Sequence, residues 1–323
     1  MTTLSPGYAL RPPTRADMGA IVDLAVACDI AEYGAPDYTL EDLVADWAAP
    51  RFELERDAWI VESPGGRLSG YGELWDREPG REFRATILVH PLDWDLGTGP
   101  RVLAAVEART RAKIREAAGT GAAAESGPAR LAVVVPSVNH RKLSLLRSAG
   151  YRHTRTFYRM DIDLTDRDPR PEPPADIEIR TFRPGADDAA MHSAIEESFA
   201  DHFGHVREPL EDWKALRMND PRYDPVHWFI AWDGAEAAGG ILGYEMGDIS
   251  WVRELGVRPA WRGSGLGKAL LLHSFAGFRA RGRMKVSLGV DSQNAYDATG
   301  LYERAGMAVG QQHQFWERQL VVS

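Results

Sequence analysis

Apolar positions follow two different patterns on either side of a short polar turn in the C-terminal half of the chain. Trp251 to Val257 has the apolar character of a strand, and after the turn Leu271, Phe275 and Phe278 recur at i, i+4 and i+7. The second spacing places three apolar side chains on one face of a helix. Arginines cluster around Gly282, which is typical of a helix C-terminus. The pattern predicts a strand, a turn and a helix of about four turns.

The chain after this helix shows the same order of a strand pattern, a polar segment and a helix pattern, each of them short. Val286 to Val290 is a short apolar run, Asp291 to Asn294 is polar, and Ala298 to Met307 has helical spacing. We therefore expect a second strand, a loop and a shorter helix.

The turn that opens the longer helix has the composition of a phosphate cradle. Glycines without a Cβ let the backbone curl until several N–H groups point at one anion, and the positive end of the helix dipole reinforces them. Arginine and lysine side chains add positive charge at the same place. The predicted phosphate-binding residues are Arg262, Gly263, Ser264, Gly265, Leu266, Gly267 and Lys268.

Two nucleotide-binding motifs that also use glycine turns do not fit this one. A Walker loop would need its first glycine at Arg262 and a serine or threonine at Ala269. The Rossmann fingerprint would need glycine at Lys268 or at Leu270. A tight turn that binds nothing stays open as an alternative, although it does not explain the flanking cations.

The turn and the later helix together resemble the acyl-CoA-binding signature of the GNAT acetyltransferases. In that family an Arg/Gln-x-x-Gly-x-Gly/Ala turn binds the CoA pyrophosphate, and an asparagine precedes a helix that carries Leu-Tyr and ends in Gly-Phe. Asn294, Leu301, Tyr302 and Gly306 match the second motif, with Met307 in place of the aromatic residue. The resemblance covers roughly residues 177 to 320 and implies acetyl-CoA as cosubstrate.

The resemblance also implies catalytic roles for two residues. Glu254 matches a position where many relatives place a carboxylate that accepts the amine proton, often through water. Tyr302 matches the tyrosine that acts as general acid toward the CoA sulfur. A salt-bridged strand carboxylate and an aromatic core residue are the respective alternatives.

Further residues are implied to bind the pantetheine arm of the cosubstrate. Leu255, Gly256 and Val257 would pair with the arm through their backbone and offer an N–H to the oxyanion. Asn294 would hydrogen-bond the same arm, and an asparagine that only caps the following helix is the alternative.

A polar segment nearer the start of the second half is the candidate acceptor pocket. Its candidate substrate residues are Asp201, His202 and His205, and an imidazole there is an alternative base because it titrates near neutrality. A plain polar loop is the simpler alternative. Two histidines three residues apart with no convincing third ligand do not predict a metal site, so no metal is expected.

Composition narrows the classes of function that remain. The chain has 323 residues, 44% of them apolar, which suffices for two domains of ordinary size. No apolar run approaches the ~20 residues that span a bilayer, so we expect a cytoplasmic protein without a membrane partner. A net charge of −9 disfavours nucleic acid and mildly favours amine-bearing partners. Cys28, the single cysteine, is expected to be a buried structural thiol.

The chain is predicted to contain two related units joined by a linker. Residues 166–176 combine four prolines with charged residues and are expected to be extended. Tyr8 to Arg11 begins one half much as Ile177 to Arg180 begins the other. Residues 1–165 and 177–323 are therefore predicted to be tandem GNAT-type units, each an α/β (α+β) fold with a mixed sheet and helices on both faces.

The first unit is predicted to be a degenerate copy and the second to be catalytic. When Val89 is aligned with Val257, the first unit keeps two cradle glycines but loses the charged and catalytic positions. Residual CoA binding by the first unit stays open. The aligned replacements are Trp94 for Arg262, Asp95 for Gly263, Thr86 for Glu254 and Leu146 for Tyr302, and the retained glycines are Gly97 and Gly99.

Two such units in this length resemble mycothiol synthase and other tandem acetyltransferases. The expected activity is direct transfer of acetyl from acetyl-CoA to a primary amine of a small molecule, by a monomer or a homodimer. A mycothiol-type, aminoglycoside or amino-acid-derived acceptor is equally compatible with the residues. The alternative is a non-catalytic acetyl-CoA-binding sensor or interaction module, which would need the cradle but neither Glu254 nor Tyr302.

Overall fold

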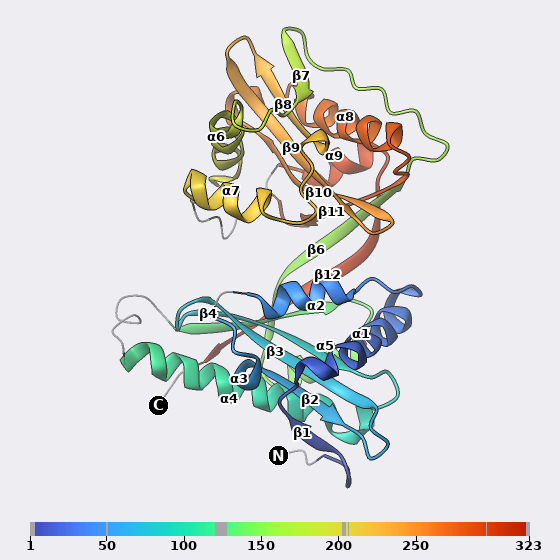
Figure 1. Cartoon of the computed structure of the whole chain (residues 1–323), viewed down its shortest axis with the longest axis vertical. Helices are drawn as coiled ribbons and strands as arrows, with labels where there is room; N and C mark the ends of the chain where they lie inside the picture. The colour runs from blue at the N-terminus through green and yellow to red at the C-terminus, as the bar shows by residue number, and fades with distance from the viewer. Residues whose placement is uncertain are drawn as a thin grey trace. The chain divides into compact units, whose positions relative to one another are not determined.

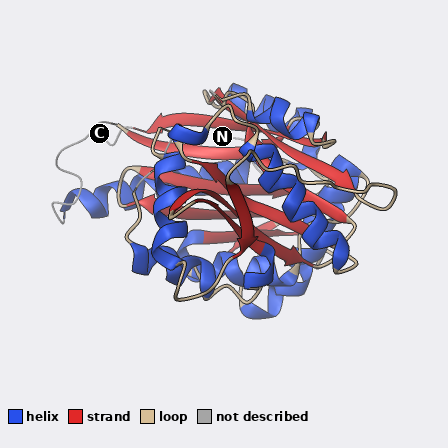
Figure 2. Cartoon of the chain, turned by 90° about the horizontal axis from the view of Figure 1, so that it is seen from above, coloured by secondary structure: helices blue, strands red, loops and turns tan. Residues whose placement is uncertain are grey.

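The chain forms two compact units, Met1–Thr156 with Gln312–Ser323, and Phe157–Gln311 (Figure 1). The computed structural model describes residues 4–49, 51–119, 128–201, 205, 207–294 and 296–320. In each unit helices cover a sheet that mixes parallel and antiparallel strands (Figure 2). This arrangement confirms the predicted mixed α/β fold class.

The strands of the first unit follow the order β1-β2-β3-β4-β5-β12. All neighbours are antiparallel except β4 and β5, which are parallel and are connected through the long helix α4. The strands are β1 (Ala9–Arg11), β2 (Ala58–Glu62), β3 (Leu68–Glu78), β4 (Glu82–Val89), β5 (Ala129–Pro136) and β12 (Ala308–Leu320). The α-helices are α1 (Met18–Tyr33), α2 (Leu40–Trp47), α3 (Leu54–Asp57), α4 (Thr98–Gly119) and α5 (His140–Ser148).

The second unit has a sheet of the same kind, in the order β6-β11-β10-β9-β8-β7. Its one parallel pair in this order is β10 with β11, and helix α8 connects the two strands. The strands are β6 (Arg152–Asp163), β7 (Ile177–Thr181), β8 (Trp228–Asp233), β9 (Glu236–Met246), β10 (Ile249–Val257) and β11 (Lys285–Asp291). The α-helices are α6 (Asp188–Phe199), α7 (Leu210–Met218), α8 (Leu266–Ala280) and α9 (Ala298–Arg304).

The last strand of each sequence half pairs outside its own half. Strand β6, which ends the first half, is antiparallel to β11, whereas β12, which ends the chain, is antiparallel to β5. The compact units therefore differ from the continuous segments 1–165 and 177–323 that the sequence predicts. Residues 166–176, between β6 and β7, contain neither helix nor strand.

Two apolar clusters cover opposite faces of the second sheet. One gathers residues of α8 and α9, and the other gathers residues of α6 and α7. Leu271, Phe275 and Phe278 are fully buried on one face of α8, as their spacing predicts. The helix ends at Ala280, and Gly282 follows it with φ 77°. Packing by these two helix layers fixes β10, the strand that carries the candidate site.

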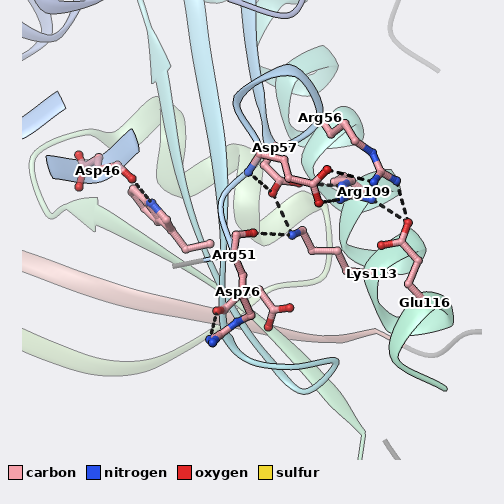
Figure 3. Close-up of polar contacts among 10 residues, drawn as sticks. Asp46, Arg51, Arg56, Asp57, Asp76, Arg109, Lys113 and Glu116 are labelled. Carbon is pink, nitrogen blue, oxygen red and sulfur yellow. Dashed lines mark hydrogen bonds and ion pairs between the residues drawn. The ribbon is translucent and has the colours of Figure 1, made fainter. Parts of the chain in front are cut away.

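An ion-pair cluster ties α3 to α4 in the first unit. Figure 3 shows Arg109 and Lys113 converging on Asp57, with Nε to Oδ1 and Nζ to Oδ2 distances of 2.7 and 2.9 Å. Asp57 is fully buried, and Arg109 also pairs with the exposed Glu116 at 3.0 Å. Asp57 has both Arg109 and Lys113 as counter-charges, and Arg109 also has Glu116, so this ion-pair cluster is structural rather than a binding site.

A second buried polar group of the first unit lies on β3. The Glu73 carboxyl is 1% exposed and accepts a hydrogen bond of 2.6 Å from the Tyr71 hydroxyl, which in turn accepts from Trp47. Burial, together with the nearby charge of Asp46, raises the pKa of Glu73 to about 8. The folded protein therefore holds a proton at neutral pH that an unfolded chain, with the ordinary pKa of 4.5, would release.

This difference predicts that the stability of the first unit falls as pH rises from about 4.5 to about 8. Within that window Glu73 lowers the free energy of unfolding by about 1.4 kcal/mol per pH unit. We expect Glu73→Gln to remove this slope and to raise Tm at pH 8, measured by calorimetric unfolding across the window. The exposed Glu55→Gln variant is the control, and parallel pH profiles for wild type and Glu73→Gln would contradict the assignment.

Candidate acetyl-transfer site of the second unit

Strands β10 and β11 separate partway along their length. Their parallel register covers three pairs, from Ser250 with Val286 to Val252 with Leu288, although β10 continues to Val257 and β11 to Asp291. A register shift between Val252 and Glu254 also bends β10 at this point. The backbone of β10 beyond the bulge thus faces an opening in the sheet, where an extended molecule can pair with it.

The glycine turn lies directly after this opening. Gly263 and Gly265 adopt φ values of 76° and 91°, which strongly favour glycine, and no other atom lies within 4 Å of a Cβ placed on either. Gly265 is the residue before the first turn of α8. The first N–H groups of a helix have no partner within the helix, so the turn presents donors toward open space.

The side chain of Arg262 points to the end of α6 rather than to the start of α8. Its Nε donates to the Val257 carbonyl (3.2 Å) and its NH2 group to the Ser198 carbonyl (2.9 Å). Its guanidinium also lies 4.0 Å from the centre of the Tyr296 ring and pairs with Asp201 at 3.4 Å. These contacts give Arg262 a role in joining β10 to α6, and direct binding of phosphate by its charge stays a prediction.

The other predicted ligands of the cosubstrate occupy distinct positions. The Ser264 hydroxyl donates to the Trp261 carbonyl at 2.7 Å, within the turn. Lys268 lies in the first turn of α8 and lines a cavity beside α9. Asn294 accepts from the Tyr296 amide, while Asp297 provides the N-cap of α9. The helix-cap alternative for Asn294 is therefore wrong, and its contact with the pantetheine arm stays a prediction.

Glu254 is the first residue of β10 beyond the bulge, on the face covered by α7. The Arg217 side chain of α7 donates to Glu254 Oε1 from Nε at 2.9 Å and also contacts Glu208 at 2.6 Å. Glu254 Oε2 is buried and has no hydrogen-bond partner among the described residues. A buried carboxylate oxygen without a partner is costly, so this atom is poised to accept a proton or a hydrogen bond from a bound molecule.

Tyr302 extends from α9 into the apolar cluster that underlies α8. Its side chain is buried, and its hydroxyl makes no hydrogen bond with any described residue. Burial raises the pKa of the phenol to about 12, so the group keeps its proton throughout the neutral range. A protonated hydroxyl without a protein acceptor can donate to a ligand atom.

The candidate acceptor residues lie in the segment between α6 and α7. Asp201 accepts a hydrogen bond from Tyr296 and pairs with Arg262, and the Tyr296 hydroxyl is the main reason why the pKa of Asp201 is lowered. His205 pairs with Glu196 of α6 at 3.4 Å. His202 lies outside the described residues.

Sequence patterns did not single out Arg217, Glu208, Glu196 or Tyr296. All four come from segments whose spacing predicts no more than a helix or a loop, and their roles arise from contacts between distant parts of the chain. The one sequence signal that could have pointed to Glu196 is the acidic composition of the segment that contains Glu196 and Glu197.

The equivalent region of the first unit lacks this constellation. Gly97 has φ 79°, like Gly265, but Asp95 is exposed in the turn and pairs with Arg141. Thr86 takes the register position that Glu254 has in β10, and Leu146 is fully buried where the second unit has Tyr302. Among the described residues, no group of three or more His, Cys, Asp or Glu side chains could hold a metal ion.

Comparison with known proteins defines the family of this chain. Residues 189–307 match the model of the acetyltransferase (GNAT) family. A mycothiol acetyltransferase of Thermobispora bispora is 33% identical over 253 residues, which is 75% of this chain and 77% of that protein. The chain belongs to the GNAT acetyltransferase family.

Solved structures resemble the chain over almost its whole length. A GCN5-related N-acetyltransferase from Sphaerobacter thermophilus superposes with a TM-score of 0.85 and 30% identity, covering 98% of this chain and 97% of that one. A tandem GNAT protein from the clavulanic acid biosynthesis pathway shares the fold with a TM-score of 0.72 and 19% identity, covering 98% and 99% of the two chains. The tandem architecture predicted from the sequence is confirmed. Across the described residues, the helices are all too short or too polar to cross a membrane.

Proposed function

We propose that the second unit transfers an acetyl group from acetyl-CoA directly to a primary amine. The observation that carries the proposal is the buried Oε2 of Glu254, which none of the described residues contacts by a hydrogen bond and which lies beside the opening between β10 and β11. The pantetheine arm would occupy that opening and pair with the backbone of Leu255, Gly256 and Val257. The pyrophosphate would bind the amides of the glycine turn at the start of α8.

The residues provide a complete path for the protons. Glu254 accepts a proton from the ammonium group of the acceptor, directly or through water, which frees the nitrogen lone pair. The nitrogen attacks the acetyl carbonyl carbon, and a β10 N–H group stabilises the oxyanion. The C–S bond then breaks, and the Tyr302 hydroxyl gives its proton to the departing thiolate. The nitrogen releases its remaining extra proton to solvent as the amide forms, and the Tyr302 phenolate takes a proton back from solvent.

The charge around Glu254 supports an amine-bearing acceptor. Glu208 and Glu254 share Arg217 as counter-ion, so that cluster carries a net negative charge. Glu196 adds a further carboxylate beside His205. The names of the relatives suggest an acceptor of the mycothiol type, namely the amine that acetylation would convert into mycothiol.

The proposal predicts that acetyl-CoA and an amine react without an acetyl-enzyme intermediate. The enzyme, acetyl-CoA and a panel of amines that includes deacetylated mycothiol are mixed, and thiol release is followed. We expect release only with an accepted amine, no added acetyl mass on the intact protein, and a fall in kcat/KM of about 10²–10⁴-fold in Glu254→Gln.

The exposed Glu236→Gln variant of β9 is the matched control and should keep the wild-type rate. A stable acetyl adduct after incubation with acetyl-CoA alone would rule out direct transfer. Tight binding of acetyl-CoA without thiol release for any amine would favour the sensor or interaction module instead.

A further inference from the structure

Arg217 is a nearly buried arginine whose orientation is fixed by its surroundings. It lies in the last turn of α7, and its side chain is 11% exposed. The guanidinium lies 5.2 Å from the centre of the Trp213 ring, which is fully buried. The Arg217 carbonyl accepts a hydrogen bond of 3.2 Å from the Tyr244 hydroxyl of β9. Contacts of both the side chain and the backbone therefore hold the guanidinium in one place.

The nitrogens of this guanidinium are divided between two carboxylates. Nε and Nη2 both approach Oε1 of Glu254, at 2.9 and 2.8 Å. Nη1 donates to Oε2 of Glu208 at 2.6 Å and to the Trp213 carbonyl at 3.5 Å. An arginine that faced one carboxylate as a fork would bind both of its oxygens. Here two nitrogens meet at a single oxygen, and Oε2 of Glu254 has no hydrogen bond with the described residues.

This division sets the direction of the second oxygen of Glu254. Because Arg217 holds Oε1 with two donors, rotation of the carboxyl group about its Cγ–Cδ bond would break both contacts. Oε2 thus keeps one orientation beside the opening between β10 and β11. A proton acceptor that is already oriented needs no further ordering when the amine arrives.

Glu208 also shares the positive charge that Glu254 receives. A cation at hydrogen-bond distance favours the ionised form of a carboxylate, and a second carboxylate on the same cation opposes that effect. Burial disfavours the Arg217 charge, but Glu254 and Glu208 together raise the pKa of the guanidinium, so Arg217 stays charged. A carboxylate that ionises too readily is a weak proton acceptor. Glu208 therefore preserves the basicity of Glu254 next to a fixed cation.

Other charged or titratable groups surround Glu254, and most of them interact with one another. Glu196 pairs with His205 at 3.4 Å, and Arg253 lies 3.8 Å from Asp220. Burial raises the pKa of Tyr244, so its hydroxyl stays neutral. The groups come from α6, from either side of α7 and from three strands, and they are Glu196, His205, Asp220, Tyr244, Arg253 and Asp291.

We propose that Arg217 is a positioning residue for Glu254, and that Glu208 moderates the effect of the Arg217 charge on the Glu254 carboxylate. The inference rests on the proposed function, since Glu254 is the base only in that reaction. Two effects then have separate origins. The paired nitrogens of Arg217 orient Oε2, and the balance between Arg217 and Glu208 sets the pH at which Glu254 takes up a proton.

The first test follows the Glu254 carboxyl directly, without any substrate. Full-length protein is labelled with carbon-13 at the glutamate carboxyl groups, the Glu254 signal is assigned through Glu254→Gln, and the signal is titrated with pH by NMR. We expect Arg217→Met, which keeps an unbranched side chain, to move the titration of Glu254 upward by about one pH unit or more. Glu208→Gln should move it downward, because Glu254 then has Arg217 to itself.

The second test separates orientation from charge. The pH profile of kcat is measured with saturating acetyl-CoA and an accepted amine of the panel, because that profile reports the enzyme–substrate complex. Arg217→Lys keeps the charge but not the planar pair of donors, so we expect the acid limb of wild type and a kcat lower by about 10-fold or more. Lys214→Gln removes a cation of α7 that pairs with Asp188 at 3.1 Å, and this control should behave as wild type in both tests.

Unchanged titration of Glu254 in Arg217→Met and Glu208→Gln would overturn the proposal, as would a shift of the same sign in both variants. A similar shift in Lys214→Gln would trace the effect to loosening of α7 and would also overturn it. A wild-type kcat in Arg217→Lys would exclude the orienting role. If Arg217→Met does not fold, the sign of the shift in Glu208→Gln still decides. If no amine of the panel is acetylated, the proposed function fails, while the NMR titration still measures how Arg217 and Glu208 act on Glu254.

Discussion

Replacement of Tyr302 by phenylalanine is expected to lower kcat by about 10²–10⁴-fold, with little change in the affinity for CoA. The phenol is buried, makes no hydrogen bond with the described residues and has a pKa raised to about 12. Its removal deletes one proton donor without opening a cavity, because phenylalanine fills the same apolar space. Steady-state kinetics and CoA titration together measure the effect.

Tyr158 provides a matched control for this substitution. It is a partly buried tyrosine of β6 that packs against the same apolar cluster, so Tyr158→Phe makes the same chemical change away from α9. We expect that variant to keep the wild-type kcat. A near-normal rate in Tyr302→Phe would move the protonation of the thiolate to solvent or to another side chain.

A carboxylate at Gly265 should abolish CoA binding, whereas the same change at Gly97 should leave it intact. Both glycines have positive φ, 91° and 79°, so Gly265→Asp and Gly97→Asp impose similar backbone strain. The new carboxylate has a different effect in the two variants, because only that of Gly265→Asp would face the pyrophosphate of CoA. Like charges brought together in a binding site cost several kcal/mol, which corresponds to a loss of affinity of about 100-fold or more.

Calorimetry with CoA distinguishes the outcomes. We expect about one site per chain in the wild type and in Gly97→Asp, and no measurable binding in Gly265→Asp. Thermal unfolding of both variants checks that the strain is comparable. Loss of a second site in Gly97→Asp would mean that the first unit also binds CoA, and unchanged binding in Gly265→Asp would place the cosubstrate elsewhere.

The elements that hold the glycine turn could be predicted from the sequence because their signals are local. The buried face of α8, the strand before it and the glycines with positive φ each follow from the spacing of a few neighbouring residues. Cys28 is buried, as its apolar surroundings predict, and its thiol donates to the Val89 carbonyl at 3.4 Å. Local patterns of this kind do not depend on how distant segments pair.

The features that sequence analysis missed all depend on contacts between distant segments. Arg217 reaches Glu254 across 37 positions of the chain, and Arg262 reaches Ser198 across 64. No spacing rule connects such residues. The Arg262 side chain was expected at the phosphate because its charge and position fit the motif, but the motif says nothing about which competing acceptors lie within its reach.

The edges of the two units also depend on contacts between distant segments, which sequence patterns do not reveal. Composition identifies the proline-rich segment, but it does not reveal that β6 pairs with β11 and β12 with β5. Both strands have an ordinary strand pattern, and the choice of neighbour is made by backbone hydrogen bonds rather than by composition. The compact units of the structure therefore have other edges than the segments predicted from the sequence.

The pairing of β12 with β5 has a consequence for how the first unit folds during translation. Strand β5 is complete once Pro136 has been synthesised, but its neighbour His313–Leu320 is made only after the residues of the second unit. Through most of translation that edge of the first sheet has open hydrogen-bonding groups, which attract strands from other chains. The first unit is thus begun before the second and completed after it, and a ribosome that stalls before His313 releases a chain with an unprotected edge.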